Sequence, residues 1–354
     1  MRLLDRYLGI TVIQTTAVVL LVMLSLDLFF NLLEEMQDVG EGSYGTGDVT
    51  VYLLLTLPRR IYETLPMALL VGGLLGMGGL AAGSELTVLR AAGVSKLRLV
   101  GSALKAGLVL SLAGLLLGEF IAPETERLAQ RWRAEAQQRA LMVGGSQGFW
   151  ARDGQHVINI RGLESGLQLR DIYIFQMDER SRLQAVIHAA RASYRDGDWL
   201  LEAVSRSQLG PVSVTADSLA SIQWRSVITP AMLEVLAAEP EDLSLRELAT
   251  YIRYLGENQL DAAQHRLALW TKLLAPGTHL TMLFVGMPLI FGSQRSTGVG
   301  QRLLVGALLG LGFYLLNRLL GNVVLLYGLP PWLGAALPPA LFAAAGAWAL
   351  HRQR

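Results

Sequence analysis

The sequence predicts an α-helical membrane protein with six transmembrane helices and an inserted all-β domain. The chain has 354 residues, of which 52% are hydrophobic and only 17% are charged. Its mean hydropathy of +0.40 is too high for an ordinary soluble domain. Three long apolar runs precede a polar stretch, residues 140–265, and three follow it. Asp-Gly pairs and alternating patterns within that stretch are typical of antiparallel strands.

The six apolar runs fix the expected spans, because a helix needs about 20 residues to cross a bilayer. We expect them at residues 9–31, 58–81, 99–121, 272–292, 302–321 and 332–350. The first run has no small-residue cleavage site, so it is expected to be a span and not a signal peptide. Basic residues mark alternate connections: Arg2, Arg6, Arg90, Lys96, Arg98, Arg295, Arg302, Arg352 and Arg354. By the positive-inside rule both termini are cytoplasmic and the β domain lies outside.

The inserted domain is expected to form hairpins at two Asp-Gly pairs, Asp153-Gly154 and Asp196-Gly197. Between them, Ile172 and Ile174 alternate with Tyr173 and Phe175, which predicts one buried and one outer sheet face. Such strands suggest a sandwich or jelly roll. The expected domains are residues 1–139 with three spans, the β domain 140–228, a helical connector 229–271 and the last three spans in 272–354. In the connector, Ser244 and Glu247 predict a capping box.

Motifs for catalysis are not found in the sequence. It has no cysteine, no G-x-x-x-x-G-K-[ST] loop, no G-x-S-x-G elbow and no metal-type spacing among its five histidines. We therefore expect no enzyme activity and no cofactor in this chain. The net charge of +1 says nothing about nucleic acid, and none is expected as a partner.

Basic residues near the outer ends of the helices break the positive-inside trend: Arg59, Arg60, Arg131, Arg133, Lys272 and Arg318. Each either snorkels or pairs with an acid such as Glu63, Glu119 or Glu124, or takes part in a site for an anionic, phosphate-bearing amphiphile. The helices just below would supply the apolar lining of such a site. For Asp27, in the first span, a helix-packing hydrogen bond is favoured over a proton relay.

The segment "GSELTVLRAAGVS" between the second and third spans predicts a short cytoplasmic helix over residues 84–93. Ser84 suits the N-cap, Glu85 suits the first turn and Gly93 suits the C′ position, which leaves about eight helical residues. Such a helix is either an ordinary turn or a contact that receives force from a separate cytoplasmic partner.

Several longer motifs resemble one family from end to end. They are "LLDRYLG", "GEGSYG", "LPMALLVGGLLGMGGLA", "SELTVLRAAGVS", "GEFIAPE", "QGFWARDG", "LWTKLLAP" and "VLLYGLPP", in this order. The sequence thereby resembles the LptF/LptG permeases of the lipopolysaccharide exporter of Gram-negative bacteria. The resemblance implies an ABC exporter of the inner membrane. In it, this chain pairs with an F-type permease paralogue above a cytoplasmic ATPase dimer that binds the ATP and Mg.

The resemblance also implies roles for particular residues. The short helix becomes the coupling helix, with Ser84, Glu85, Leu86, Leu89 and Arg90 toward the ATPase. Lipopolysaccharide, taken from the outer leaflet, would meet Arg59, Arg60, Arg133, Lys272, Phe313 and Tyr314. "NLLEEMQD" stands where relatives carry lysines after the first span, so a phosphate contact from that helix is in doubt.

The resemblance further implies that the β domain joins a periplasmic bridge of jelly rolls, together with a bitopic jelly-roll protein of the same system. Two alternatives remain. An ion-coupled secondary transporter would need paired ionisable residues in mid-membrane, for which only Asp27 and Lys105 qualify. A non-transporting membrane scaffold with a periplasmic binding domain is the other.

Overall fold

The computed structural model describes residues 2–137, 149–164, 168–178, 182–195, 197–210, 213–226, 239–291 and 298–352. Several expectations fall outside these ranges: the basic residues Arg295 and Arg354, the turn residue Asp196, and the β-domain boundaries at 140 and 228.

The first half of the membrane domain contains three long helices and one short one. They are α1 (Arg2–Glu35), α2 (Thr46–Ala82), α3 (Glu85–Ala91) and a third long rod that runs from Lys96 to Ala136. That rod comprises α4 (Lys96–Leu116), a π-helical turn η1 (Leu117–Ile121) and α5 (Ala122–Ala136). The second half contains α7 (Leu245–Glu257), α8 (Ala263–Phe291), α9 (Val299–Leu326) and α10 (Pro331–Arg352).

Six of the described helices are long and apolar enough to cross a membrane, which confirms the predicted number. Each is longer than its predicted span, because the apolar run marks only the part inside the hydrocarbon layer. Helix α2 begins at Thr46 and not near Pro58, so that Pro58 and Pro66 both lie inside the helix. The Lys96–Ala136 rod of 41 residues likewise continues well past its apolar part.

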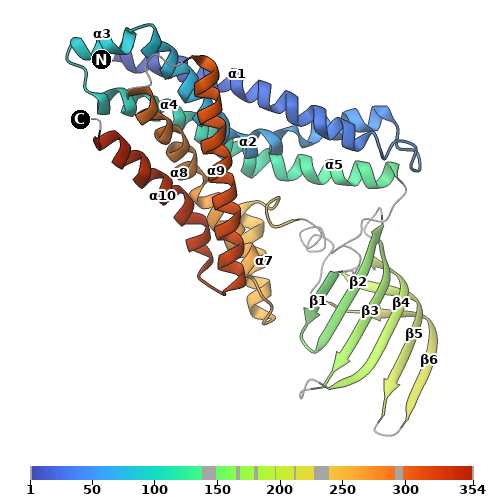
Figure 1. The fold of residues 1–354 in the computed structure, drawn as a ribbon. Helices are drawn as coiled ribbons and strands as arrows, with labels where there is room; N and C mark the ends of the chain where they lie inside the picture. Colours follow the sequence, from blue (N-terminus) through green and yellow to red (C-terminus); the bar gives the residue numbers. More distant parts are fainter. Residues whose placement is uncertain are drawn as a thin grey trace.

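The inserted all-β domain is confirmed as one antiparallel sheet between α5 and α7. Its strands are β1 (Phe149–Asp153), β2 (His156–Glu164), β3 (Gln168–Met177), β4 (Leu183–Arg195), β5 (Asp198–Leu209) and β6 (Val214–Trp224). Each described strand pairs with the next along the chain, so the domain is a meander. Figure 1 shows that this sheet is strongly curved.

The predicted hairpins and faces are observed in the sheet. Asp153 pairs with His156 around Gly154, whose φ is 58°. A second tight turn joins β4 to β5 at Gly197, with a φ of 92°. Both angles lie in the left-handed region that favours glycine. Ile172 and Ile174 are fully buried in the core of the sheet, as their alternation predicts.

Glycines in α2 allow the first two membrane helices to pack at backbone distance. A Cβ on Gly72 would lie 2.5 Å from the Cα of Thr16. Beside it, the Thr15 hydroxyl donates a hydrogen bond to the Gly72 carbonyl at 2.8 Å. This close approach is the packing role expected of small residues in membrane helices.

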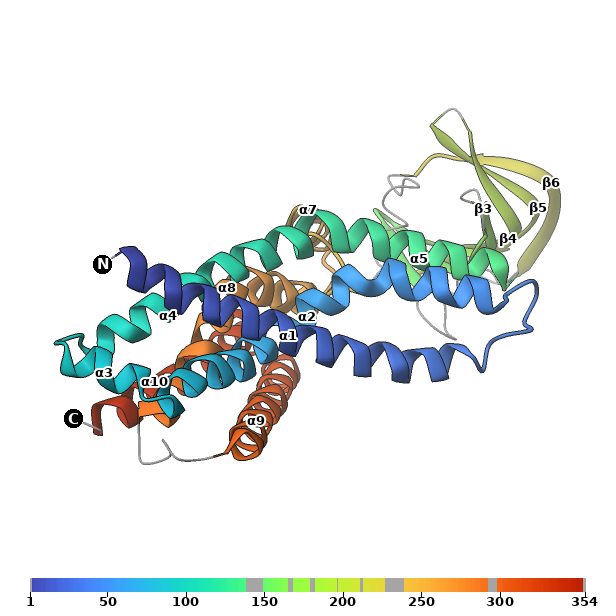
Figure 2. The ribbon, with the colours of Figure 1, turned by 90° about the horizontal axis from the view of Figure 1, so that it is seen from above.

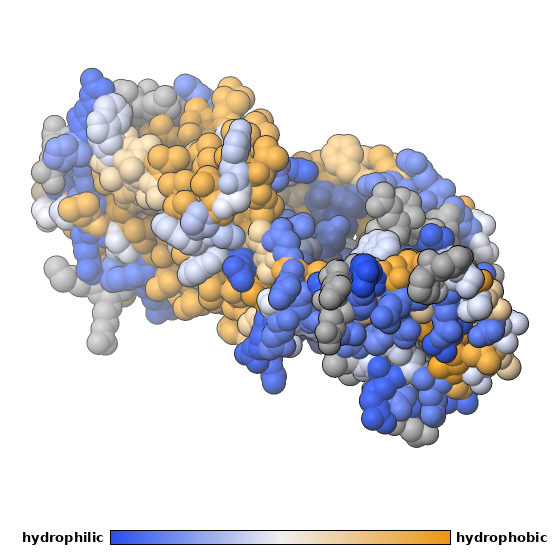
Figure 3. Space-filling model, turned by 90° about the horizontal axis from the view of Figure 1, so that it is seen from below, coloured by the Kyte–Doolittle hydropathy of each residue, from blue (hydrophilic) through white to orange (hydrophobic). Residues whose placement is uncertain are grey.

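The two ends of the molecule differ in character. Figure 2 shows both termini and α3 at one end, and the sheet at the other end beside the far end of α5. Figure 3 shows apolar surface gathered over the helical part and mostly polar surface over the sheet.

Candidate functional site

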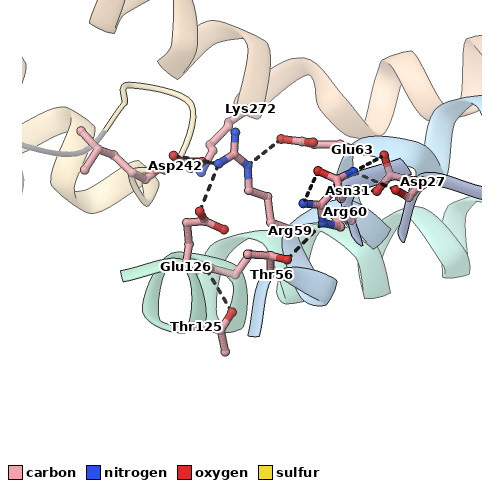
Figure 4. Close-up of polar contacts among 12 residues, drawn as sticks. Asp27, Asn31, Thr56, Arg59, Arg60, Glu63, Thr125, Glu126, Asp242 and Lys272 are labelled. Atoms are coloured by element: carbon pink, nitrogen blue, oxygen red, sulfur yellow. Dashed lines mark hydrogen bonds and ion pairs between the residues drawn. The ribbon is translucent and has the colours of Figure 1, made fainter. Parts of the chain in front are cut away.

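Arg59 of α2 lies among three acidic side chains (Figure 4). Its guanidinium group bonds Glu63 at 2.8 Å and Asp242 at 2.9 Å, and lies 3.4 Å from Glu126. Pairing with Glu63 is one of the alternatives that the sequence offers, whereas Asp242 and Glu126 were not expected. Burial raises the pKa of Asp242 to about 7, although the Arg59 guanidinium opposes that shift.

Arg60 points away from Arg59 and toward α1 (Figure 4). It bonds Asp27 at 2.6 Å and the side-chain oxygen of Asn31 at 2.9 Å. It also donates to the hydroxyl of Thr56 at 3.1 Å. Asp27 therefore makes an interhelical ion pair, in line with the packing role favoured for it.

Arg133, near the end of α5, contacts residues at the end of α1 and near the start of α2. It bonds Asp38 at 2.5 Å and lies 3.3 Å from Glu35. Its guanidinium carbon is 5.3 Å from the centre of the Tyr52 ring, which is within cation–π range. Two acids of "NLLEEMQD", Glu35 and Asp38, are thus partners of Arg133.

The remaining predicted cargo residues do not converge on one point. Lys272 is buried and donates its Nζ hydrogen bond to the carbonyl of Leu243. Phe313 is buried edge-on against Phe342, with ring centres 5.2 Å apart. Tyr314 is exposed and accepts a hydrogen bond from Arg318 at 3.1 Å.

Apart from Glu63, which is an i,i+4 partner of Arg59, the acids of this site lie far from the arginines in sequence. Asp242 is separated from Arg59 by 183 residues, and Asp38 from Arg133 by 95. Pairs so far apart cannot be predicted from a local spacing pattern in the sequence. The available signal was compositional: residues 31–57 hold five acids and no basic residue, while the ends of the neighbouring helices are basic.

The helix α3 forms as expected but is capped differently. Ser84 is at the N-cap position as predicted, but it adopts a φ of 61° and its side chain makes no cap hydrogen bond. Its backbone is left-handed, whereas a serine that caps through its side chain typically has an extended backbone. Gly93, at the C′ position with a φ of 91°, is confirmed.

The five coupling residues have different environments. Leu86 is 3% exposed and packs into the core of the membrane domain, and Leu89 packs partly against the same core. Glu85 is exposed and accepts a hydrogen bond from the Tyr7 hydroxyl at 2.7 Å. Arg90 is in the last turn of the helix. Only part of α3 is therefore available to another protein.

Known proteins resemble this chain over its whole length. The family model described as "Lipopolysaccharide export system permease LptF/LptG" matches residues 6–352. The chain belongs to this family. It is 34% identical to the lipopolysaccharide export system permease protein LptG of Escherichia coli K12, over 99% of this chain and 98% of the relative. It is 32% identical to LptG of Haemophilus influenzae, over 99% of both chains.

The F-type permeases match over a shorter stretch. LptF of Escherichia coli K12 is 26% identical over 167 residues, which is 44% of this chain and 45% of the relative. Family membership and the six apolar helices make the chain a multi-pass protein of the inner membrane. As an LptF/LptG permease it is a transport subunit and not a catalyst. Within the described residues no group of His, Asp and Glu is arranged to hold a metal ion.

Proposed function

We propose that this chain is the transmembrane permease subunit of an ATP-driven lipopolysaccharide exporter. It takes lipopolysaccharide from the outer leaflet of the inner membrane and passes it to a periplasmic bridge of jelly rolls. The observation that carries the proposal is the match to two LptG permeases over 99% of the chain, through both membrane halves and the β insertion.

The exposed apolar faces of the spanning helices are consistent with contacts to a partner subunit and to a lipid cargo. Among the six spans, α1 and α9 are the least buried within this chain. Their exposed apolar side chains include Val18, Leu21, Leu26, Phe30, Leu304, Leu308, Leu315 and Leu319. An F-type permease would cover part of these faces, and cargo acyl chains entering from the side would cover the rest.

The basic residues would meet the cargo phosphates. Arg59, Arg60 and Arg133 already pair with carboxylates of this chain, so a phosphate would replace or share those partners. Arginine suits such exchange, since its planar fork binds carboxylate and phosphate with similar geometry. Lys272, Phe313 and Tyr314 would act from the neighbouring helices α8 and α9.

Energy would come from a cytoplasmic ATPase dimer that holds ATP and Mg. The contact would be α3, where Glu85 and Arg90 present charges and Leu86 fixes the helix to the membrane core. Both termini would then lie in the cytoplasm and the sheet in the periplasm, and the position of both termini at the same end of the molecule as α3 supports this (Figure 2). The β domain would then face the bitopic jelly-roll protein.

Site-specific photo-crosslinking in cells tests the proposal. A photoreactive residue at position 59 or 133 should give adducts that an antibody against lipopolysaccharide detects, and their amount should depend on ATP. Leu97, which is exposed in the first turn of α4, is the matched control and should give none. Equal labelling at 97, 59 and 133 would overturn the proposal.

The two alternatives have less support. Both candidate residues for ion coupling have partners in this chain: Asp27 bonds Arg60 at 2.6 Å and Lys105 bonds Asp5 at 2.9 Å. An ion-coupled transporter would run on an ion gradient without ATPase, and a scaffold would move no cargo. Transport by the reconstituted complex, with and without ATP, separates all three.

A further inference from the structure

A short stretch of the connector, Asp242–Glu247, is attached to the membrane domain at four points. Arg59 on α2 binds the Asp242 side chain, and Lys272 on α8 binds the Leu243 carbonyl. Glu119 in η1 accepts from the Leu245 amide, and Arg127 on α5 binds Glu247. We call these four membrane-domain residues the clamp: Arg59, Glu119, Arg127 and Lys272.

The π-helical turn places Glu119 at the first amide of α7. Both carboxylate oxygens of Glu119 accept from the Leu245 N–H, at 2.9 and 3.0 Å. A carboxylate at a helix N-terminus satisfies a free amide and favours the helix dipole. Single π-turns inside α-helices often occur at functional sites, because the extra residue redirects side chains. Gly118 leaves room for this turn, since a Cβ there would lie 2.6 Å from the Tyr62 ring.

Arg127 adds a second contact to the same helix end. It bonds Glu247 at 2.6 Å. Glu247 also closes the capping box, accepting from the Ser244 amide at 2.9 Å while its own amide donates to the Ser244 hydroxyl at 3.3 Å. The Glu247 side chain, which caps the start of α7, is therefore also bonded to α5 through Arg127.

Helix α7 in turn holds the sheet. The Tyr254 hydroxyl donates to the carbonyl of Arg152 in β1 at 3.0 Å. Tyr251, Tyr254 and Leu255 are buried in the same apolar cluster as the sheet core. A continuous set of contacts therefore runs from the membrane helices through the clamp and α7 into β1.

We propose that the clamp residues are positioning residues that set where α7, and with it the β domain, lies relative to the membrane helices. The clamp joins α2, η1, α5 and α8 to one short backbone segment, so a shift of any of these helices moves the start of α7. The assignment holds whether or not the chain exports lipopolysaccharide, since it concerns contacts within the chain. It also gives Arg59 and Lys272 a function that needs no cargo.

Spin-label distances in the full-length chain in nanodiscs test the clamp. The chain has no cysteine, so Val109→Cys on α4 and Leu219→Cys on β6, both exposed, can be labelled alone. Glu119→Ala and Arg127→Ala should each broaden or shift the distance distribution between these labels, and the double variant should do so more. Glu119→Gln keeps an acceptor oxygen and Arg127→Lys keeps the charge, so both should restore most of the wild-type distribution.

Arg182→Ala is the control, because it removes an exposed arginine between β3 and β4 that pairs with Asp178 at 3.0 Å. It should leave the distribution unchanged. Hydrogen exchange of α7 gives a second measurement: its first-turn amides should exchange at least several-fold faster in Glu119→Ala than in Glu119→Gln. A wild-type distribution and wild-type exchange in the folded double variant would overturn the proposal. Neither measurement needs cargo or ATPase, so a failure here is distinguishable from a failure of the export proposal.

Discussion

The hydroxyl group of Tyr7 donates a hydrogen bond to a carboxylate oxygen of Glu85, at 2.7 Å, and so ties α1 to α3. Nearby, Asp5 bonds Arg98 at 3.0 Å and Lys105 at 2.9 Å, both on α4. The first turns of α1 are thus joined to α3 and to the helix that follows it. A displacement of α3 by a cytoplasmic partner would reach α1 directly, through side chains and not only through the chain connections.

We expect Glu85→Ala to weaken recovery of the ATPase in co-purification while the chain still inserts. Glu85 is the only acid in the segment from Gly83 to Ser95, so no neighbour replaces its charge. Tyr7→Phe removes the hydroxyl but keeps Glu85, so docking should persist while ATP-driven export falls. Normal ATPase recovery and normal export in Glu85→Ala would remove Glu85 from the coupling role.

We expect the double variant Arg59→Glu with Arg133→Glu to lose lipopolysaccharide-stimulated ATPase activity. A charge-assisted contact contributes about 1.5–3 kcal/mol. Reversal would also place new carboxylates beside Asp242 and Asp38, so stability must be measured in the same preparations. The matched double Arg→Lys variant keeps both charges and should retain most of the stimulation. Wild-type stimulation in the monodisperse Glu variant would show that the phosphate site lies elsewhere.

The raised pKa of Asp242 predicts a pH-dependent contribution to stability. Asp242 binds its proton more tightly in the folded chain, where its pKa is about 7 in place of 3.8. Its contribution is therefore full below about pH 4 and is lost as the pH rises through 7. The charged groups that act on it are Arg59, Glu63, Glu126, Glu239 and Lys272.

The melting temperature measured from pH 5 to pH 8 checks this expectation. Wild type should lose stability with rising pH relative to Asp242→Asn, whose side chain does not titrate. Asp178→Asn, which alters an ion pair between β3 and β4, serves as a control and should leave the wild-type slope intact. If the melting temperatures of wild type and Asp242→Asn changed in parallel with pH, that result would contradict the raised pKa of Asp242.

Much of the fold follows from local pattern, whereas the polar partners depend on long-range contacts. Six apolar runs predict the helices, and the Asp153-Gly154 turn fixes a hairpin, because both signals depend on neighbouring residues. Pro58 misleads because a membrane helix tolerates proline where other groups satisfy the backbone. The partner of Arg59, Asp242, is set by where the connector crosses the membrane domain, and that path has no sequence signature.

Close packing of α1 on α2 predicts a sharp difference between two glycines of the same helix. Gly72→Ala would force a Cβ against the Thr16 backbone, an overpacking that costs about 1–3 kcal/mol. Gly79→Ala adds its Cβ to open space, so it should be neutral or slightly stabilising. The thermal midpoint of each purified variant in detergent checks this expectation. An equal change in midpoint for both variants would contradict the close packing of α1 on α2 at Gly72.

The last prediction concerns the free edge of the sheet. In the described strands, β6 pairs with β5 alone, and its side chains are largely exposed, including Val214 and Leu219. An unpaired antiparallel edge is a template for strand addition, so we expect β6 to bind the jelly roll of another protein edge to edge. A photoreactive residue at position 219 should then crosslink to a periplasmic jelly-roll protein, which mass spectrometry would identify. Trp150, exposed on β1, is the control at the opposite edge and should not give that adduct.

Deleting residues 140–225 should abolish delivery to the bridge while the six spans still insert. Delivery at the wild-type rate by the deletion variant, or the same adduct from both edges, would show that β6 is not the docking strand.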